Sequence, residues 1–261
     1  MDERRATDPR NRTNPIAAGS MTPEDRSGER FAAQLGTSRS RCLRFVNGAY
    51  RITLRADSHT RVLYRARFGS RTPTVGVQGG VVTIRYPRVT SCDWLNCRSE
   101  HPAEVALNAR IRWDIEVRGG ASRLLADLRG LRLGSLSLDG GASRLEMVLP
   151  APSGSVAVVI LGGASNVAIR RPEGVAARLR VDGGATNLEF DGRHIGAAGG
   201  ELDLQSRDYY GATDRYDVAV TGGANNLSID EQRGANRTRD AGRPRKTQDE
   251  TEGADLDQEG E

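Results

Sequence analysis

A glycine doublet that returns about every 21 residues limits this chain to a repetitive fold. The unit has the form G-G-A-[S/T/N], and its copies are separated by 21, 22, 21 and 39 residues, the last spacing being nearly two periods. Self-similarity at a period of about 20 to 50 residues is typical of solenoids, propellers and other repeat arrays. The doublets are Gly119 and Gly120, Gly140 and Gly141, Gly162 and Gly163, Gly183 and Gly184, and Gly222 and Gly223.

Aliphatic residues alternate with other residues on both sides of each doublet. Ile115 and Val117 precede the first doublet, and Leu145 and Met147 follow the second. A period of two on both sides predicts two short strands per repeat, each with one buried face. Because equivalent residues stack from turn to turn in a repeat array, the pattern predicts a buried ladder of Leu124, Leu145, Val167 and Leu188 and a polar ladder of Asn166 with Asn187.

We therefore predict an all-β fold, a single-stranded β-solenoid (β-helix) with turns of about 20–22 residues and G-G-A-[S/T] corners. Glycine lacks the Cβ that disfavours positive φ, so the chain can bend sharply at each doublet. Asn47-Gly48, Gly79-Gly80 and residues 199–204 fit as degenerate turns. The alternative is an antiparallel β-sandwich in which the Gly-Gly pairs close hairpins.

The repeats lie within residues 41–230, which we predict to form the solenoid domain. Residues 1–40 and 231–261 are charged and poor in aliphatic side chains. Such segments bury too little apolar surface to offset the entropy of ordering. Both ends are therefore predicted to be disordered tails.

The charge pattern does not indicate nucleic-acid binding. The net charge is +4 and the pI is 9.2, but 37 of the 38 basic residues are arginine, a bias that a GC-rich genome explains. Acidic residues are interspersed throughout, and no sustained basic stripe emerges. The chain has no signal-like leader and no apolar run of about 20 residues that could span a bilayer. A cytoplasmic location is expected, and the odd number of cysteines fits a reducing compartment.

The recurring G-G-A-S-x-L units, together with the segment from Gly79 to Pro87 (GGVVTIRYP), resemble the bacterial "putative adhesin" or toast-rack β-solenoid families, related to cell-wall-active antibiotic response proteins. The resemblance covers about residues 42–230. It implies a β-solenoid and a link to membranes or envelope stress, and it supplies no catalytic motif.

Cys42, Cys92, Cys97 and His101 are the candidate metal ligands. Three sulfurs and an imidazole would suit zinc, but a C-x4-C followed by x3-H is a weak signature. A disulfide between Cys92 and Cys97 is a second possibility, and a plain insertion loop is the favoured one. We therefore predict no cofactor.

Catalytic candidates are few. Glu146 and Glu189 occupy equivalent outward positions two predicted turns apart, about 9.6 Å, which is near the carboxylate separation of inverting glycosidases. A solvated strand face explains them more simply. His194 and His59 are placed in loops as minor acid-base candidates, and no nucleophile-elbow, P-loop or dinucleotide motif occurs. Tyr209 and Tyr210 either contact a partner or cap the core.

The predicted function is accordingly a non-catalytic structural or protein-interaction solenoid with an unknown protein partner, linked to bacterial envelope stress, with self-association an open possibility. One alternative is a self-assembling scaffold like the bactofilins, formed by end-to-end stacking of bare turns. The other is a carbohydrate-active β-helix enzyme.

Overall fold

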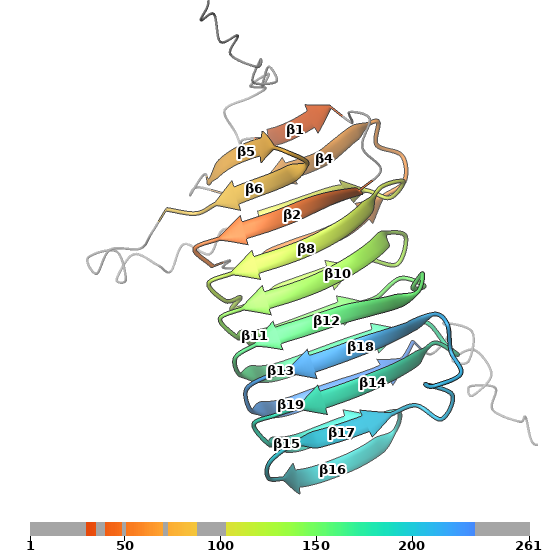
Figure 1. Cartoon of the computed structure of the whole chain (residues 1–261). Coiled ribbons are helices and arrows are strands. Elements are labelled where there is room, and N and C mark those ends of the chain that lie inside the picture. Colours follow the sequence, from red (N-terminus) through yellow and green to blue (C-terminus); the bar gives the residue numbers. More distant parts are fainter. Residues whose placement is uncertain (1–29, 35–39, 49–50, 70–72, 88–102, 233–261) are drawn as a thin grey trace, which may run out of the picture.

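The computed structural model describes residues 30–34, 40–48, 51–69, 73–87 and 103–232 (Figure 1). Within these ranges the chain forms strands β1 to β19 and no helix, so no helix that could cross a membrane occurs there. The prediction of an all-β fold is confirmed.

The strands form two facing sheets with a continuous hydrophobic core between them. Sheet A contains, in spatial order, β1 (Arg30–Gln34), β4 (Val62–Arg67), β7 (Ala103–Asn108), β3 (Ile52–Asp57), β9 (Leu124–Asp127), β11 (Ala142–Val148), β13 (Ala164–Arg171), β19 (Ala224–Glu231), β15 (Ala185–Phe190) and β16 (Arg193–Ala198). Sheet B contains β5 (Thr74–Gln78), β6 (Val81–Arg85), β2 (Ser40–Val46), β8 (Arg112–Arg118), β10 (Arg132–Asp139), β12 (Ser155–Leu161), β18 (Arg215–Val220), β14 (Ala176–Val181) and β17 (Leu202–Gln205).

From β8 to β15 the chain alternates between the sheets, so one strand of sheet B and the next strand of sheet A make one coil. Neighbouring coils pair in parallel, for example β10 with β8 and β11 with β9. The structure places all five glycine doublets at the corner from sheet B to sheet A. At Gly141 the φ angle is +78°, and an added Cβ would lie 2.9 Å from the carbonyl oxygen of Gly163 in the next coil. Glycine is required there because the stacked corners approach so closely.

The predicted ladders exist, and each has one further member inserted within it. The buried ladder runs Leu124, Leu145, Val167, Leu227, Leu188 in register. In the polar ladder Asn226 lies between Asn166 and Asn187, with amide-to-amide hydrogen bonds of 3.0 and 2.5 Å. These asparagines have φ between +52° and +55°, a left-handed conformation that asparagine tolerates better than most residues.

The additional members come from the last coil of the chain, which is inserted between two earlier coils. Strand β18 pairs in parallel with β12 on one side and β14 on the other, and β19 does the same with β13 and β15. Figure 1 shows the blue C-terminal strands between green ones. Sequence order and spatial order therefore differ at this end of the molecule.

Both ends of the stack are antiparallel. Strands β4 and β5 run against β7 and β6 at one end, and β16 and β17 run against β15 and β14 at the other. The two sheets are thus mixed, and the topology is not that of a uniform single-stranded solenoid.

Two of the three degenerate turns differ from the prediction. Gly79 and Gly80, with φ of +57° and +85°, close a two-residue hairpin between β5 and β6 inside sheet B, so their assignment as a corner between strands of a parallel coil was wrong. Positive φ at both positions is the type I′ geometry that such hairpins favour. Residues 199–204 belong to the reversed coil of β16 and β17, whereas Asn47 and Gly48 form a true corner between β2 and β3.

Strand β1 lies inside the segment predicted to be an N-terminal tail, where it pairs with β4. Its five residues therefore belong to the folded domain. Most of both predicted tails falls outside the described residues.

Candidate interaction site at the C-terminal cap

The predicted metal ligands are not brought together in the described part of the chain. Cys42 lies in β2, half-buried, and burial together with the nearby Glu116 raises the pKa of its thiol to about 11. Cys92, Cys97 and His101 lie outside the described residues. Among the residues that are described, no group of three or more His, Cys, Asp or Glu side chains could hold a metal ion.

The predicted carboxylate pair is farther apart than expected. Between Glu146 and Glu189 the register places Ala168 and Ser228, because β13 and the inserted β19 both separate β11 from β15. Three strand spacings amount to about 14 Å rather than about 9.6 Å. The predicted separation was therefore wrong.

The two histidine candidates lie apart from each other. His194 is in strand β16 rather than in a loop, directly opposite Glu189 on the neighbouring strand. His59 is in a turn after β3, where its backbone N–H donates to the carboxylate of Asp57 at 2.9 Å. The contact between His59 and Asp57 is an ordinary turn interaction.

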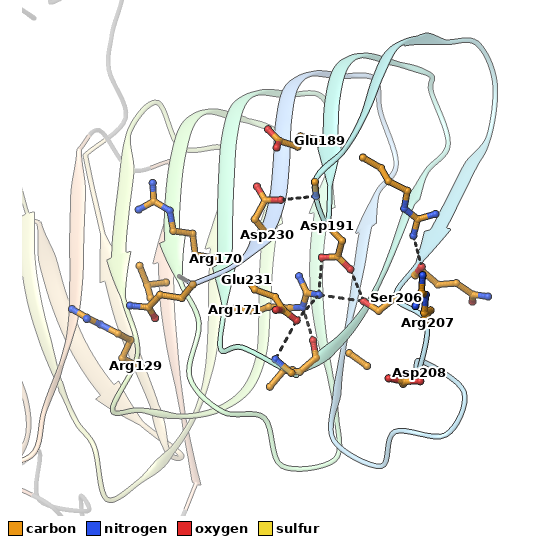
Figure 2. A pocket seen from close by; sticks show the side chains of 18 residues that line it. Arg129, Arg170, Arg171, Glu189, Asp191, Ser206, Arg207, Asp208, Asp230 and Glu231 are labelled. Atoms are coloured by element: carbon orange, nitrogen blue, oxygen red, sulfur yellow. Dashed lines mark hydrogen bonds and ion pairs between the residues drawn. The ribbon is translucent and has the colours of Figure 1, made fainter. Parts of the chain in front are cut away.

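The most elaborate polar cluster surrounds Arg171, at the end of β13 (Figure 2). This side chain is only 1% exposed. Its Nε donates to the carbonyl of Val175 at 2.5 Å, and its Nη2 donates to Ser206 Oγ at 3.2 Å. The same Nη2 lies 2.7 Å from Asp191 Oδ1 and 3.6 Å from Glu231 Oε1. One guanidinium thus ties together β13, the turn after β15, the end of β17 and the end of β19.

Ser206 is fully engaged in this cluster. Its hydroxyl donates to Asp191 Oδ2 at 2.9 Å and accepts from the backbone N–H of Ala177 at 3.1 Å, in addition to accepting from Arg171. In the described residues no histidine is hydrogen-bonded to this hydroxyl, which distinguishes it from a Ser–His pair.

A groove runs past this cluster along the ends of the strands of sheet A. Exposed residues of both signs line it, among them Arg129, Arg170, Glu189, Arg207 and Asp208. Figure 2 shows that they come from several coils and from the segment after β17. Because acids and arginines balance, the groove does not favour ligands of one charge.

Ser206 begins the loop of residues 206–214, which connects β17 to β18. We call this loop, with β16 and β17, the C-terminal cap.

Tyr209 fixes the middle of the loop against sheet B. It is buried, its hydroxyl donates to the carboxylate of Asp217, and the guanidinium carbon of Arg215 lies 4.9 Å from its ring centroid. Burial and the hydrogen bond to Asp217 raise the pKa of Tyr209.

Further contacts brace the loop and its surroundings. Asp214 accepts a hydrogen bond from the backbone N–H of Gly154 at 2.6 Å. Arg178 pairs with Asp203 on the adjacent β17, and hydrogen bonding from Arg178 lowers the pKa of that carboxyl. The loop is therefore held at its beginning, middle and end.

Tyr210 projects from this braced loop and is 75% exposed. Its ring meets that of Tyr209 edge-on, with 5.5 Å between the centroids. The sequence left two roles for the tyrosine pair, and the structure divides them: Tyr209 packs against the core, and Tyr210 faces solvent.

The role of Arg171 was not predicted from the sequence. The alternating pattern does indicate that Arg171 is buried, because Val167, Ile169 and Arg171 occupy successive inward positions of β13. A charge at the third inward position requires buried partners.

Residues 74–170 match a family described as the N-terminal domain of toast_rack, DUF2154. This stretch is a toast-rack N-terminal domain. The match starts at β5 and ends within β13, so the C-terminal cap lies beyond the matched part of the toast-rack domain. The toast-rack family is not a known enzyme family.

Among solved structures, a protein of Clostridium sporogenes described as a putative cell adhesion protein matches with a TM-score of 0.60 at 14% sequence identity. The match covers 81% of this chain and all of the other. At this identity the likeness shows a shared fold. No curated protein sequence matches the chain.

Proposed function

We propose that this toast-rack protein is a rigid, non-catalytic β-solenoid that binds a protein partner through the loop at residues 206–214, and that it serves in the bacterial response to envelope stress. The exposed Tyr210 on a braced loop supports the binding role most directly. The family and the structural neighbour fit a non-catalytic structural domain. A cytoplasmic location stays a prediction.

The loop around Tyr210 is rigid before a partner binds. Tyrosine and arginine are enriched at protein–protein hot spots, and tyrosine brings a large contact area at small entropic cost. Tyr210 is already positioned by the ring of Tyr209 below it, and Arg207 and Asp208 beside it are exposed. A partner therefore gains contact area without having to order the loop.

Site-specific photo-crosslinking in living cells tests the proposal. A photoreactive phenylalanine analogue replaces Tyr210 in one strain, and Leu125, which is 41% exposed on sheet A, in a control strain. We expect a discrete adduct of larger mass from position 210 and none from position 125. No adduct at 210, or the same adducts from both positions, would contradict the proposal.

The purified partner then permits a quantitative test. Tyr210→Ala should weaken its binding about 30-fold, as loss of a hot-spot residue costs about 2 kcal/mol. Leu125→Ala should leave binding unchanged. Equal affinities of the two variants would show that the crosslink reports proximity rather than a binding contact.

A further inference from the structure

The two ends of the stack differ in one respect. At the C-terminal end both sheets finish together, with β16 in sheet A and β17 in sheet B. At the N-terminal end the reversed coil of β4 and β5 is followed by β1 in sheet A alone, so that sheet A has ten strands and sheet B nine. Among the described residues no strand of sheet B faces β1 (Figure 1).

Strand β5 shows the effect of this gap on side chains. Val75 and Val77 pair with Ile84 and Val82, whose side chains are fully buried, so both valines belong to the inward face of sheet B. Val77 is nevertheless 49% exposed. Within the described part of the chain, the inward face at this edge therefore lacks a neighbour.

The edge of β5 is also unprotected. None of its five residues, TVGVQ, is charged or proline. Natural edge strands usually carry charges, prolines or bulges that prevent pairing with another chain. The cap strands at the opposite end have such charges, with Asp203 in β17 and Arg193 in β16.

Strand β1 has the properties of the missing neighbour. It is five residues long, as β5 is. Phe31 and Ala33 pair with Ala66 and Tyr64 and are partly buried against the core, so they form the inward face of β1. Two inward residues spaced two apart match Val75 and Val77 of β5.

We propose that two copies of this chain associate end to end through their N-terminal ends, with β1 of each copy completing sheet B of the other beside β5. A two-fold axis parallel to the strands, midway between the sheets, exchanges sheet A with sheet B. It brings β1 of one copy into the place next to β5 of the other. By the same symmetry, β1 of the second copy lies next to β5 of the first.

Strand direction is compatible with this arrangement. Strand β1 is antiparallel to β4, and β4 is antiparallel to the parallel strands of sheet A, so β1 runs with those parallel strands. The parallel strands of sheet B run in the direction opposite to the parallel strands of sheet A, because each coil crosses one sheet and returns along the other. Strand β5 is antiparallel to its neighbour in sheet B and therefore has the same direction as β1. Rotation about an axis along the strands keeps their direction, so β1 and β5 meet as parallel neighbours. A two-fold axis perpendicular to the sheets would instead superimpose β4 of one copy on β1 of the other if it brought the two β5 strands together, and would leave sheet B open if it paired the two β1 strands.

The proposed contact closes on itself and yields a dimer. Each N-terminal end is used once, and the flush C-terminal ends take no part. This distinguishes it from the stacking of bare turns in a bactofilin-like filament.

Light scattering coupled to size-exclusion chromatography of the full chain, from low to high micromolar concentration, tests the dimer. Val77→Lys places a charge on the inward edge where it can still reach water in the monomer. Leu161→Lys is the matched control, since Leu161 is 43% exposed in the middle of sheet B. Val77→Thr keeps the shape and serves in case the lysine variant fails to fold.

We expect a dimer for the wild type and for Leu161→Lys. Each valine lost from the contact should weaken dimerisation about tenfold, so Val77→Lys should lower the affinity about a hundredfold or more. Val77→Thr should weaken it in the same direction. Amide hydrogen exchange in β1 and β5 should slow on dimerisation.

Three results on the state of assembly would overturn the proposal. They are a monomeric wild type at every concentration, a Val77→Lys variant that folds and dimerises like the wild type, and growth of the wild type into longer assemblies. A dimer without slower exchange in β1 and β5 would equally place the interface elsewhere.

Discussion

The corner at Gly141 permits a quantitative test of the stacked coils. In Gly141→Ala the new methyl must be held at a φ of +78°, a left-handed conformation that costs an alanine about 1–2 kcal/mol. The methyl also lies 2.9 Å from the backbone oxygen of Gly163, which cannot rotate away. Overpacking of this kind costs about 1–3 kcal/mol.

Gly163→Ala is the matched control from the next coil. At Gly163 φ is outside the left-handed region, and the nearest atom to an added Cβ is 3.7 Å away. Both substitutions restrict the unfolded chain to the same extent, which stabilises each variant by about 0.4–1 kcal/mol. The difference between the two variants therefore isolates the cost in the folded corner, about 3 kcal/mol.

Urea unfolding of both variants, followed by circular dichroism, measures this difference in unfolding free energy, and thermal unfolding gives the corresponding difference in Tm. A domain of this size loses about 2–4 °C of Tm per kcal/mol, so we expect the Tm of Gly141→Ala to lie about 6–12 °C below that of Gly163→Ala. Equal unfolding free energies would refute the argument that close stacking fixes glycine at this corner.

Three further predictions concern charged and strained residues. Arg171→Met removes the buried cation that joins the half-buried Asp191 and the exposed Glu231 and should destabilise the fold by about 3 kcal/mol in urea unfolding. Arg144 has a φ of +62° at the position occupied by Asn166 in the next coil, so Arg144→Asn should stabilise by about 0.5–1 kcal/mol and raise the Tm. Arg44 lowers the pKa of Glu116 below its usual 4.5, so this pair stabilises the fold above pH 4.5 and ceases to do so as the pH falls through the lower folded pKa.

The outcomes that contradict them are equally definite. If Arg171→Met is as stable as the wild type, the cluster does not hold the C-terminal coils together. A lower Tm for Arg144→Asn would show that the arginine makes a contact worth more than the strain it bears. For the acid pair, Glu116→Gln should be less stable than wild type at pH 7, and this difference should shrink as the pH falls through the lowered pKa of Glu116. A difference independent of pH would be inconsistent with the pairing.

The regular coils were predictable from the sequence because their determinants are local. Alternation fixes which face of each strand is buried, and the glycine doublets fix where the chain bends. Corresponding residues such as Val158, Val218 and Leu179 are all aliphatic and inward-facing. Nothing in such interchangeable residues reveals which coil neighbours which, so the insertion of β18 and β19 could not be foreseen.

The ends and the site depend on non-local contacts. The hairpin at Gly79 and Gly80 and the corner at Asn47 and Gly48 have similar sequences, and only their partner strands distinguish them. The sequence does not distinguish the roles of Tyr209 and Tyr210. The contact between Tyr209 and Asp217 shows that Tyr209 packs against the core. The order of coils therefore determines the site as well as the fold.

The position of β18 and β19 also affects how the chain can fold during synthesis. Most repeat arrays add one unit after another to a growing stack. Here the coil of β18 and β19 is synthesised after the two coils that flank it, so β14 and β15 cannot pair with β18 and β19 until Glu231 has been synthesised. Synthesis that stops between β17 and β18 would therefore release a chain with a gap inside the stack rather than a shorter stack.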